Sequence, residues 1–234
     1  MKRALPFLII GTVLVIAVVA ALYLKRSANA PVAPATPTPS SPTASNGTTT
    51  GNETAAAETG ALPPHTQGPE NAPVTLEEFG DFECPPCGML HPVLKTMEKE
   101  FGLRIRLIFR EFPLVPAHVH ALAAARSAEA AGLQGKFWEM HDLLYENQKS
   151  WHDAFDARPI FEDYATRIGL NLEKFRSDGL GETVAQRIFL DGKRAHALGV
   201  SGTPTVFMNG REVPFESLAP DKLRALINAQ LNTK

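Results

Sequence analysis

The two cysteines of this chain lie three positions apart, in Cys84-Pro85-Pro86-Cys87. Two thiols at this spacing on the first turn of a helix can close a short disulfide loop. The first thiol would also lie at the positive end of the helix dipole, where unpaired backbone N–H groups stabilise a thiolate. The alternative is half of a metal site, but such a site needs further soft ligands and only His91 is close by. We therefore favour thiol–disulfide exchange, with no metal and with the Cys84–Cys87 disulfide in place of a cofactor.

The segments around the cysteine pair predict the elements that position it. Residues 74–82 begin with the alternating pattern of a strand, and Glu78 falls on the same face as two aliphatic residues. A helical pattern follows the cysteines and runs through Phe101, where Gly102 is well suited to end it. Residues 103–109 then alternate as a second strand. This order predicts a parallel βαβ unit with the cysteines at the start of its helix.

The rest of the chain is predicted to be mostly helical, with a hairpin near its end. The predicted segments are a helical stretch over 113–181, a helix over 182–198, strands over 205–208 and 211–213 joined by a turn at Asn209-Gly210, and a final helix over 219–231.

Composition excludes several classes of protein. A formal net charge of -2 argues against a nucleic-acid-binding protein, which usually carries a strongly basic patch. Two cysteines cannot build a disulfide-rich scaffold or a four-thiolate zinc site. With 44% hydrophobic and 21% charged residues, the chain as a whole is predicted to fold.

The amino-terminal part differs from the rest. Residues 4–24 carry no charge and have two basic residues on each side, which is typical of a transmembrane helix. A cleaved signal peptide is the alternative, with a cleavage pattern at Ala28-Asn29-Ala30, but Pro31 would then directly follow the cut. We expect a membrane anchor over 1–26, a disordered linker rich in Pro, Thr and Ala over 27–68, and one folded domain over 69–234.

The folded part resembles the thioredoxin fold and, within it, the DsbA-like family of exported thiol–disulfide oxidoreductases. Four features carry the resemblance: Cys84-Pro85-Pro86-Cys87 after a strand, Glu78 six residues before the first cysteine, Pro92 five residues after the second, and Gly202-Thr203-Pro204-Thr205-Val206-Phe207 near the C-terminus. The helical stretch over about 113–181 resembles the helical insertion of this family. The expected fold class is therefore α/β, thioredoxin-like with an inserted helical subdomain, preceded by the transmembrane helix and the linker.

The resemblance also implies roles for single residues. Glu78 would be a buried carboxylate that exchanges a proton with the second cysteine, whereas an exposed glutamate is the alternative. Pro204 is similar to the cis-proline that packs against the disulfide in this fold, and Thr203 would offer backbone groups to a peptide substrate. Pro92 is similar to a proline that kinks the helix, a structural role.

Other side chains show no pattern of a site. His91 lies one turn past Cys87 and could contact it, but a surface position or packing is favoured. The histidines that show no ligand spacing are His118, His120, His141, His152 and His196. Trp138 and Trp151 are predicted to pack in the core.

Three functions remain open from the sequence. The favoured one is an anchored thiol oxidase outside the cytosol, in the periplasm or at the cell exterior, which acts on cysteine-containing exported proteins and is reoxidised by a membrane partner of the DsbB type. The second is a tethered reductase or disulfide isomerase that receives electrons from a membrane thiol carrier. The third is a non-catalytic module that binds a peptide or a metal.

The residues around the thiols indicate how oxidising the disulfide is. Pro85 and Pro86 lack N–H groups and tune the site by removing donors to the thiolate. The best-known oxidases of the family place a histidine where this chain has Pro86. Nearby carboxylates (Glu77, Glu78, Asp81 and Glu83) should also disfavour a thiolate. We expect a potential between those of DsbA, about -120 mV, and thioredoxin, about -270 mV.

Overall fold

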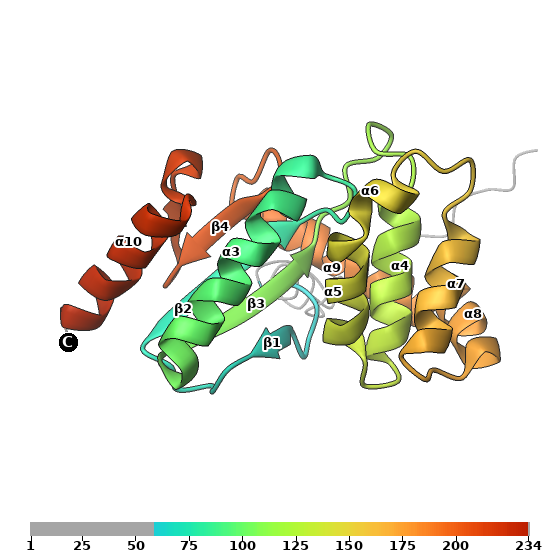
Figure 1. Cartoon of the computed structure of the whole chain (residues 1–234), viewed down its shortest axis with the longest axis horizontal. Coiled ribbons are helices and arrows are strands. Elements are labelled where there is room, and N and C mark those ends of the chain that lie inside the picture. Colours follow the sequence, from blue (N-terminus) through green and yellow to red (C-terminus); the bar gives the residue numbers. More distant parts are fainter. Residues whose placement is uncertain (1–58, 234) are drawn as a thin grey trace, which may run out of the picture. The chain divides into compact units, whose positions relative to one another are not determined.

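The structure is a computed structural model that describes residues 59–233 (Figure 1). These residues form a five-stranded sheet with the order β1-β3-β2-β4-β5. The strands are β1 (His65–Gln67), β2 (Val74–Gly80), β3 (Ile105–Glu111), β4 (Thr205–Met208) and β5 (Arg211–Val213). The helices are α3 (Pro85–Phe101), α4 (Ala121–Gly132), α5 (Phe137–Glu146), α6 (Gln148–Trp151), α7 (Arg158–Arg167), α8 (Leu172–Leu180), α9 (Glu182–Ala197) and α10 (Pro220–Asn232), with short 3-10 turns at Gly102–Arg104 and Phe215–Ser217.

The central strand of the sheet is β2, which pairs in parallel with β3 and antiparallel with β4. Helix α3 connects β2 to β3, so the predicted βαβ unit is present. This helix begins after Cys84, whose extended backbone serves as its N-cap, and ends at Gly102, whose φ of 54° favours glycine. The thioredoxin-like α/β fold with a helical insertion confirms the predicted fold class.

Helices cover both faces of the sheet near its centre. On one face, Leu94 of α3 and Leu223 of α10 share an apolar cluster with Leu76 of β2. On the opposite face, Ala195 of α9 packs with Phe79. Because successive side chains of a strand point to opposite faces, β2 contributes to both clusters and is buried on both sides.

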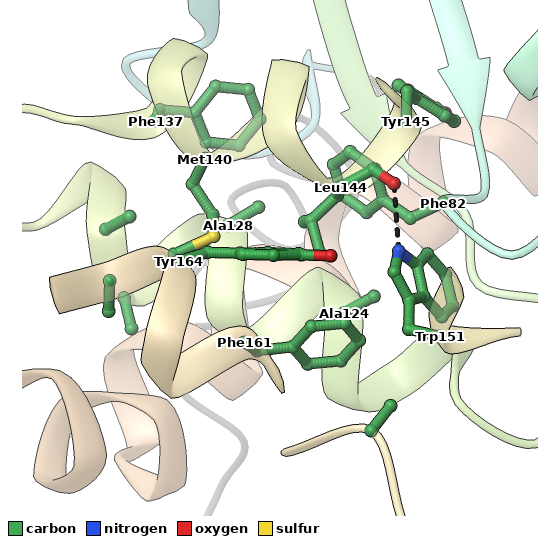
Figure 2. Close-up of a cluster of buried hydrophobic side chains, with 14 of the residues drawn as sticks. Phe82, Ala124, Ala128, Phe137, Met140, Leu144, Tyr145, Trp151, Phe161 and Tyr164 are labelled. Atoms are coloured by element: carbon green, nitrogen blue, oxygen red, sulfur yellow. Dashed lines mark hydrogen bonds between the residues drawn. The ribbon is translucent and has the colours of Figure 1, made fainter. Parts of the chain in front are cut away.

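The helical insertion has a core of its own beside the sheet, which Figure 1 shows at the right-hand side. Small alanines on α4 allow the larger side chains of neighbouring helices to pack closely against it. Figure 2 shows this core, where the Trp151 indole N–H donates to the Leu144 carbonyl over 2.9 Å. Both cysteines belong to the same apolar cluster. The insertion therefore packs directly against the cysteine pair.

The folded domain starts earlier than the expected boundary at residue 69. Strand β1 pairs with β3, with His65 opposite Phe109. Ahead of it, the Ala61 N–H donates to Asp191 Oδ1 over 2.8 Å, and Ala61 is fully buried. The composition of this segment resembles that of the linker, so only its pairing with the sheet reveals that it is part of the domain.

The predicted transmembrane segment over 4–24 lies outside the described residues, as does most of the predicted linker. Within residues 59–233, no helix is both long and apolar enough to cross a membrane. The N-terminal anchor therefore stays a prediction.

Candidate active site

The cysteine pair lies at the amino-terminal end of α3, with both thiols free and buried. Cys84 is 4% exposed and Cys87 is 0% exposed. The sheet and the helical insertion enclose Cys84 as well as its partner. Cys87 is the deeper of the two.

The two thiols differ strongly in acidity. A hydrogen bond from the Cys87 side chain lowers the pKa of Cys84 to about 6, although burial alone would raise it. The backbone N–H of Cys87 also lowers this pKa, and it is the first N–H that follows the two prolines. Burial raises the pKa of Cys87 well above its ordinary value. Near neutral pH, Cys84 is therefore the thiolate and Cys87 the thiol.

The loop before β4 closes the site from the other end of the chain. The Thr203–Pro204 bond is cis, as the resemblance implied, and Pro204 is buried. In its protonated form, the Cys84 thiol donates to the Thr203 carbonyl over 3.3 Å, although 119 residues separate them. The structure thus brings together two of the motifs found in the sequence.

Glu78 lies on the central strand and is 5% exposed. Burial, and secondly the negative charge at Cys84, raise the pKa of Glu78 to about 8. Its Oε1 has no hydrogen-bond partner among the described residues. The expectation that Glu78 is buried is correct, whereas the expectation that it adds a negative charge beside the thiolate was wrong, because it is mostly protonated at pH 7.

The neighbouring carboxylates also differ from the expectation. Glu77 points to the opposite face of β2, where it forms ion pairs with Arg110 over 2.8 Å and Arg194 over 2.7 Å. Asp81 does raise the pKa of Cys84 by its charge. Glu83 accepts a hydrogen bond from the backbone N–H of His120. Asp81 is thus an acidic residue whose charge opposes the thiolate.

His118 is a site residue that the sequence did not reveal. Its Nδ1 lies 2.7 Å from Asp81 Oδ2. Burial alone would lower the pKa of His118. The Asp81 carboxylate and the negative charge at Cys84 outweigh this effect, so the pKa of His118 is raised overall. A protonated His118 thus offsets the Asp81 charge beside the thiolate. No spacing could have identified it, because His118 lies 37 residues from Asp81 in an irregular loop.

Gln148 of α6 holds the helical insertion against the cysteine turn. Its Nε2 donates to the carbonyls of Phe82 over 2.7 Å and Cys84 over 2.9 Å. A side chain at Gly88 would collide with this amide, since a Cβ there would lie 2.5 Å from Gln148 Oε1. A side chain at Gly88, the residue after the cysteine motif, would therefore displace the Gln148 amide.

A hydrogen-bonded cluster of α3 and α5 side chains lies one turn beyond the cysteines. Asp142 Oδ1 lies 3.0 Å from both His91 Nε2 and His141 Nδ1, and Lys95 donates to Asp142 Oδ2 over 3.0 Å. His91 is buried, so it is a packing residue, one of the two positions we had favoured. It also stacks on Tyr145.

Comparison with protein families identifies one match. The family model described as thioredoxin matches residues 61–229. The chain is also 45% identical over 148 residues to Na(+)/H(+) antiporter NhaA 1 of Salinispora arenicola, and 40% identical over 171 residues to NhaA 3 of Salinispora tropica. These matches cover 63% and 71% of this chain but 22% and 25% of the relatives. The chain thus spans about a quarter of the length of these curated relatives.

Solved structures show the same fold. BdbD from Bacillus subtilis is similar with a TM-score of 0.64 and 22% identity, over 72% of this chain and 93% of that one. A periplasmic thioredoxin-like protein from Salmonella enterica serovar Typhimurium is similar with a TM-score of 0.60 and 21% identity, over 76% of this chain and 95% of that one. The thiol-disulfide exchange protein α-DsbA2 from Wolbachia pipientis has a TM-score of 0.59 and 20% identity, over 79% of this chain and 99% of that one. At such identities the similarity concerns the fold.

Proposed function

This chain belongs to the thioredoxin family, and from that premise we propose that it is a DsbA-type thiol–disulfide oxidoreductase acting on cysteines of extracytoplasmic proteins. The observation that carries the proposal is the contrast between the two thiols of one motif. Cys84 has a pKa of about 6 and faces the Thr203 carbonyl, whereas the deeper Cys87 has a raised pKa. A nucleophile and a resolving thiol need this difference.

The reaction transfers the disulfide in two exchanges. A substrate thiolate attacks Cys84 Sγ, the Cys84–Cys87 bond breaks, and Cys87 leaves as a thiolate that takes up a proton. A second substrate thiolate then attacks the substrate sulfur of the mixed disulfide and releases the Cys84 thiolate. The substrate loses two electrons and the protein gains them. Glu78 is the proposed proton donor to Cys87, and Thr203 would hold the substrate backbone.

The oxidising direction is favoured because a stabilised thiolate stabilises the reduced protein, which makes the disulfide a better oxidant. A pKa of about 6 for Cys84 lies between the values of about 3.5 for DsbA and about 7 for thioredoxin. The reduced pair would then be reoxidised by a membrane oxidase of the DsbB type. A reductase or isomerase supplied by a thiol carrier is the alternative direction.

Exposed apolar side chains next to the site support an unfolded protein as the substrate. Met89 follows the cysteines on α3 and is exposed. Val119 adjoins His118, and Phe155 adjoins Ala154, whose carbonyl accepts a hydrogen bond from His120. Such a surface fits the apolar segments that an exported chain exposes before it folds.

Sodium–proton antiport is not proposed for this chain, because it spans about a quarter of the relatives that carry that name. An extracytoplasmic location is proposed for two reasons. The disulfides that the proposed enzyme would form in its substrates persist in oxidising compartments, and residues 4–24 are predicted to anchor the chain.

Trapping of mixed disulfides tests the proposal. A Cys87→Ala variant incubated with an oxidised cysteine-containing protein should accumulate mixed disulfides through Cys84, and Cys84→Ala should accumulate none. A variant without either cysteine is the control. Equal trapping by both single variants would overturn the assignment of the nucleophile, and wild-type protein that exchanges with no substrate would overturn the function.

The direction is tested in intact cells by alkylating free thiols before lysis. Cys84 and Cys87 found mainly as a disulfide would support the oxidase. The pair found mainly as free thiols would favour the reductase or isomerase.

A further inference from the structure

The proposed exchange requires a route for protons between the buried Cys87 thiol and solvent. Cys87 is fully buried, and Glu78, which would exchange a proton with it, is 5% exposed. The titratable groups that face this part of the interior are Cys84 just before α3, Cys87, His91 and Lys95 of α3, His141, Asp142 and Tyr145 of α5, Glu111 of β3, and Asp81. Glu78 itself has no direct partner among the described residues at Oε1, so its proton needs a further carrier to reach solvent.

A small cavity lies between the sheet, α3 and α5, and Glu78 lines it. Its volume is about 20 Å³, which is room for roughly one water molecule. Three buried polar atoms among its lining residues have no hydrogen-bond partner within the described part of the chain: Glu78 Oε1, Gln67 Oε1 and His141 Nε2. Apolar side chains form most of the remaining wall. The polar atoms match the two to four partners that a buried water requires.

The chemistry of these three groups is complementary to one water. A protonated Glu78 can donate to the water oxygen, while the Gln67 carbonyl oxygen and His141 Nε2 can each accept one of its hydrogens. Burial lowers the pKa of His141 to about 4, so its ring is neutral at pH 7 and has one free nitrogen lone pair. Nδ1 carries the proton, because it donates to Asp142 Oδ1 over 3.0 Å. The lone pair therefore belongs to Nε2, the atom left without a protein partner.

Asp142 connects this histidine to the surface. Its side chain is 25% exposed, and Lys95 donates to its second oxygen over 3.0 Å. Burial alone would raise the pKa of Asp142, but the hydrogen bonds from His141, His91 and Lys95 hold it well below its usual range. An ionised carboxylate at this position keeps the His141 ring in one orientation and places its Nδ1 proton next to solvent.

We infer that a water in this cavity joins Glu78 to His141, and that His141 and Asp142 carry the Cys87 proton between Glu78 and solvent. The inference rests on the proposed function and extends it with a relay. During oxidation of the pair, Glu78 takes the Cys87 proton and passes one through the water to His141 Nε2, while the Nδ1 proton leaves past Asp142. During reduction, a proton returns along the same groups to Cys87. The ring thus regains its first tautomer after each cycle.

The test measures the closing step, in which Cys87 displaces glutathione from a Cys84–glutathione mixed disulfide. His141→Gln keeps a polar side chain in the cavity but cannot relay a proton, and we expect this step to slow by about tenfold or more near neutral pH. The reduction potential should stay unchanged, because a relay alters a rate and not an equilibrium. The rate should also lose the pH profile of the wild type, which a purely structural role would not explain.

His152→Gln is a matched control. His152 also has its Nδ1 3.0 Å from the aspartate that follows it, but it lies on the surface away from the cavity. Its rate should equal that of the wild type. Asp142→Asn is a second variant, at a partly exposed position, and we expect it to slow the same step. It tests the relay even where His141→Gln does not fold.

The outcomes separate the relay from the function. Rates of His141→Gln and Asp142→Asn within about twofold of the wild type at every pH would overturn the relay while leaving the function intact. Equal slowing by His152→Gln would overturn it as well. A wild-type protein that never forms the Cys84–glutathione disulfide would instead overturn the proposed function.

Discussion

Two adjacent glutamates on β2 show how the two faces of one strand differ. Glu77 points to the face where Arg110 and Arg194 lie, and although burial alone would raise its pKa, the two guanidinium groups lower it. Glu78 points to the face of α3, where burial raises its pKa to about 8. Both side chains are buried. The partner on each face, and not the residue type, decides which glutamate is a fixed anion and which can exchange a proton.

The face of Glu77 is organised around charge pairing. Arg110 also donates to Asp191 Oδ1 over 2.9 Å and to the Ala61 carbonyl over 2.8 Å, which ties β3, α9 and the segment before β1 together. The face of Glu78 instead has polar atoms around a small cavity that find no hydrogen-bond partner within residues 59–233. The first arrangement stabilises the fold, whereas the second suits a group that must change its protonation state.

The largest expected loss of stability at pH 7 comes from removing the paired carboxylate. Glu77→Ala should lower the free energy of unfolding by about 3 kcal/mol, because it removes the buried carboxylate that Arg110 and Arg194 share. Urea denaturation at pH 7 measures it. Glu78→Gln, on the opposite face, should not destabilise the protein. A similar loss from both substitutions would contradict the comparison.

The pH dependence of stability should differ between wild type and Glu78→Gln. The pKa of Glu78 is about 8 in the folded protein against an ordinary 4.5, so unfolding releases a proton between these values. Stability that Glu78 contributes is thus complete below about pH 4.5 and is lost as pH rises towards 8. Denaturation of the reduced protein should show the wild type losing about 1.4 kcal/mol per pH unit relative to the variant. Parallel curves would show that Glu78 has an ordinary pKa.

Pro86→His tests how the residues between the cysteines set the pKa of Cys84. The substitution adds a donor and a charge at the start of α3, so it should stabilise the Cys84 thiolate and raise the potential. A thiolate favoured by one to two pKa units corresponds to about 30–60 mV. Equilibration with glutathione measures both proteins, and we expect the wild type between DsbA and thioredoxin. A wild-type potential as oxidising as that of DsbA, or an unchanged potential in the variant, would contradict this.

The smallest expected effect concerns His118. His118→Ala removes the imidazole that offsets the Asp81 charge beside Cys84, so the pKa of Cys84 should rise by about half a unit. The ultraviolet absorbance of the thiolate as a function of pH measures this shift. His152→Ala, at an exposed position, is the control. A fall in the Cys84 pKa would show that His118 does not support the thiolate.

The sequence by itself determined the features that depend on local spacing. Two cysteines at the start of a helix, the alternation of β2 and the helical periodicity of the insertion follow from residue order and predicted the βαβ unit and the helices after it. The fold class as a whole came from the resemblance to a known family. The resemblance to a known family added the cis bond before Pro204, which spacing alone would not have suggested. It also pointed to the burial of Glu78.

The tertiary structure alone decided the protonation of the site. Burial of Cys84, the pairing of Glu77, and the approach of His118 and Gln148 all depend on segments that are far apart in the chain. A pKa depends on desolvation and on the charges within a few ångströms, and neither quantity has a periodic signature in the sequence. The same holds for a cavity, whose walls come from six separate elements. Residue order therefore fixed which thiols react, whereas packing fixed which of them is charged and which carboxylate can serve it.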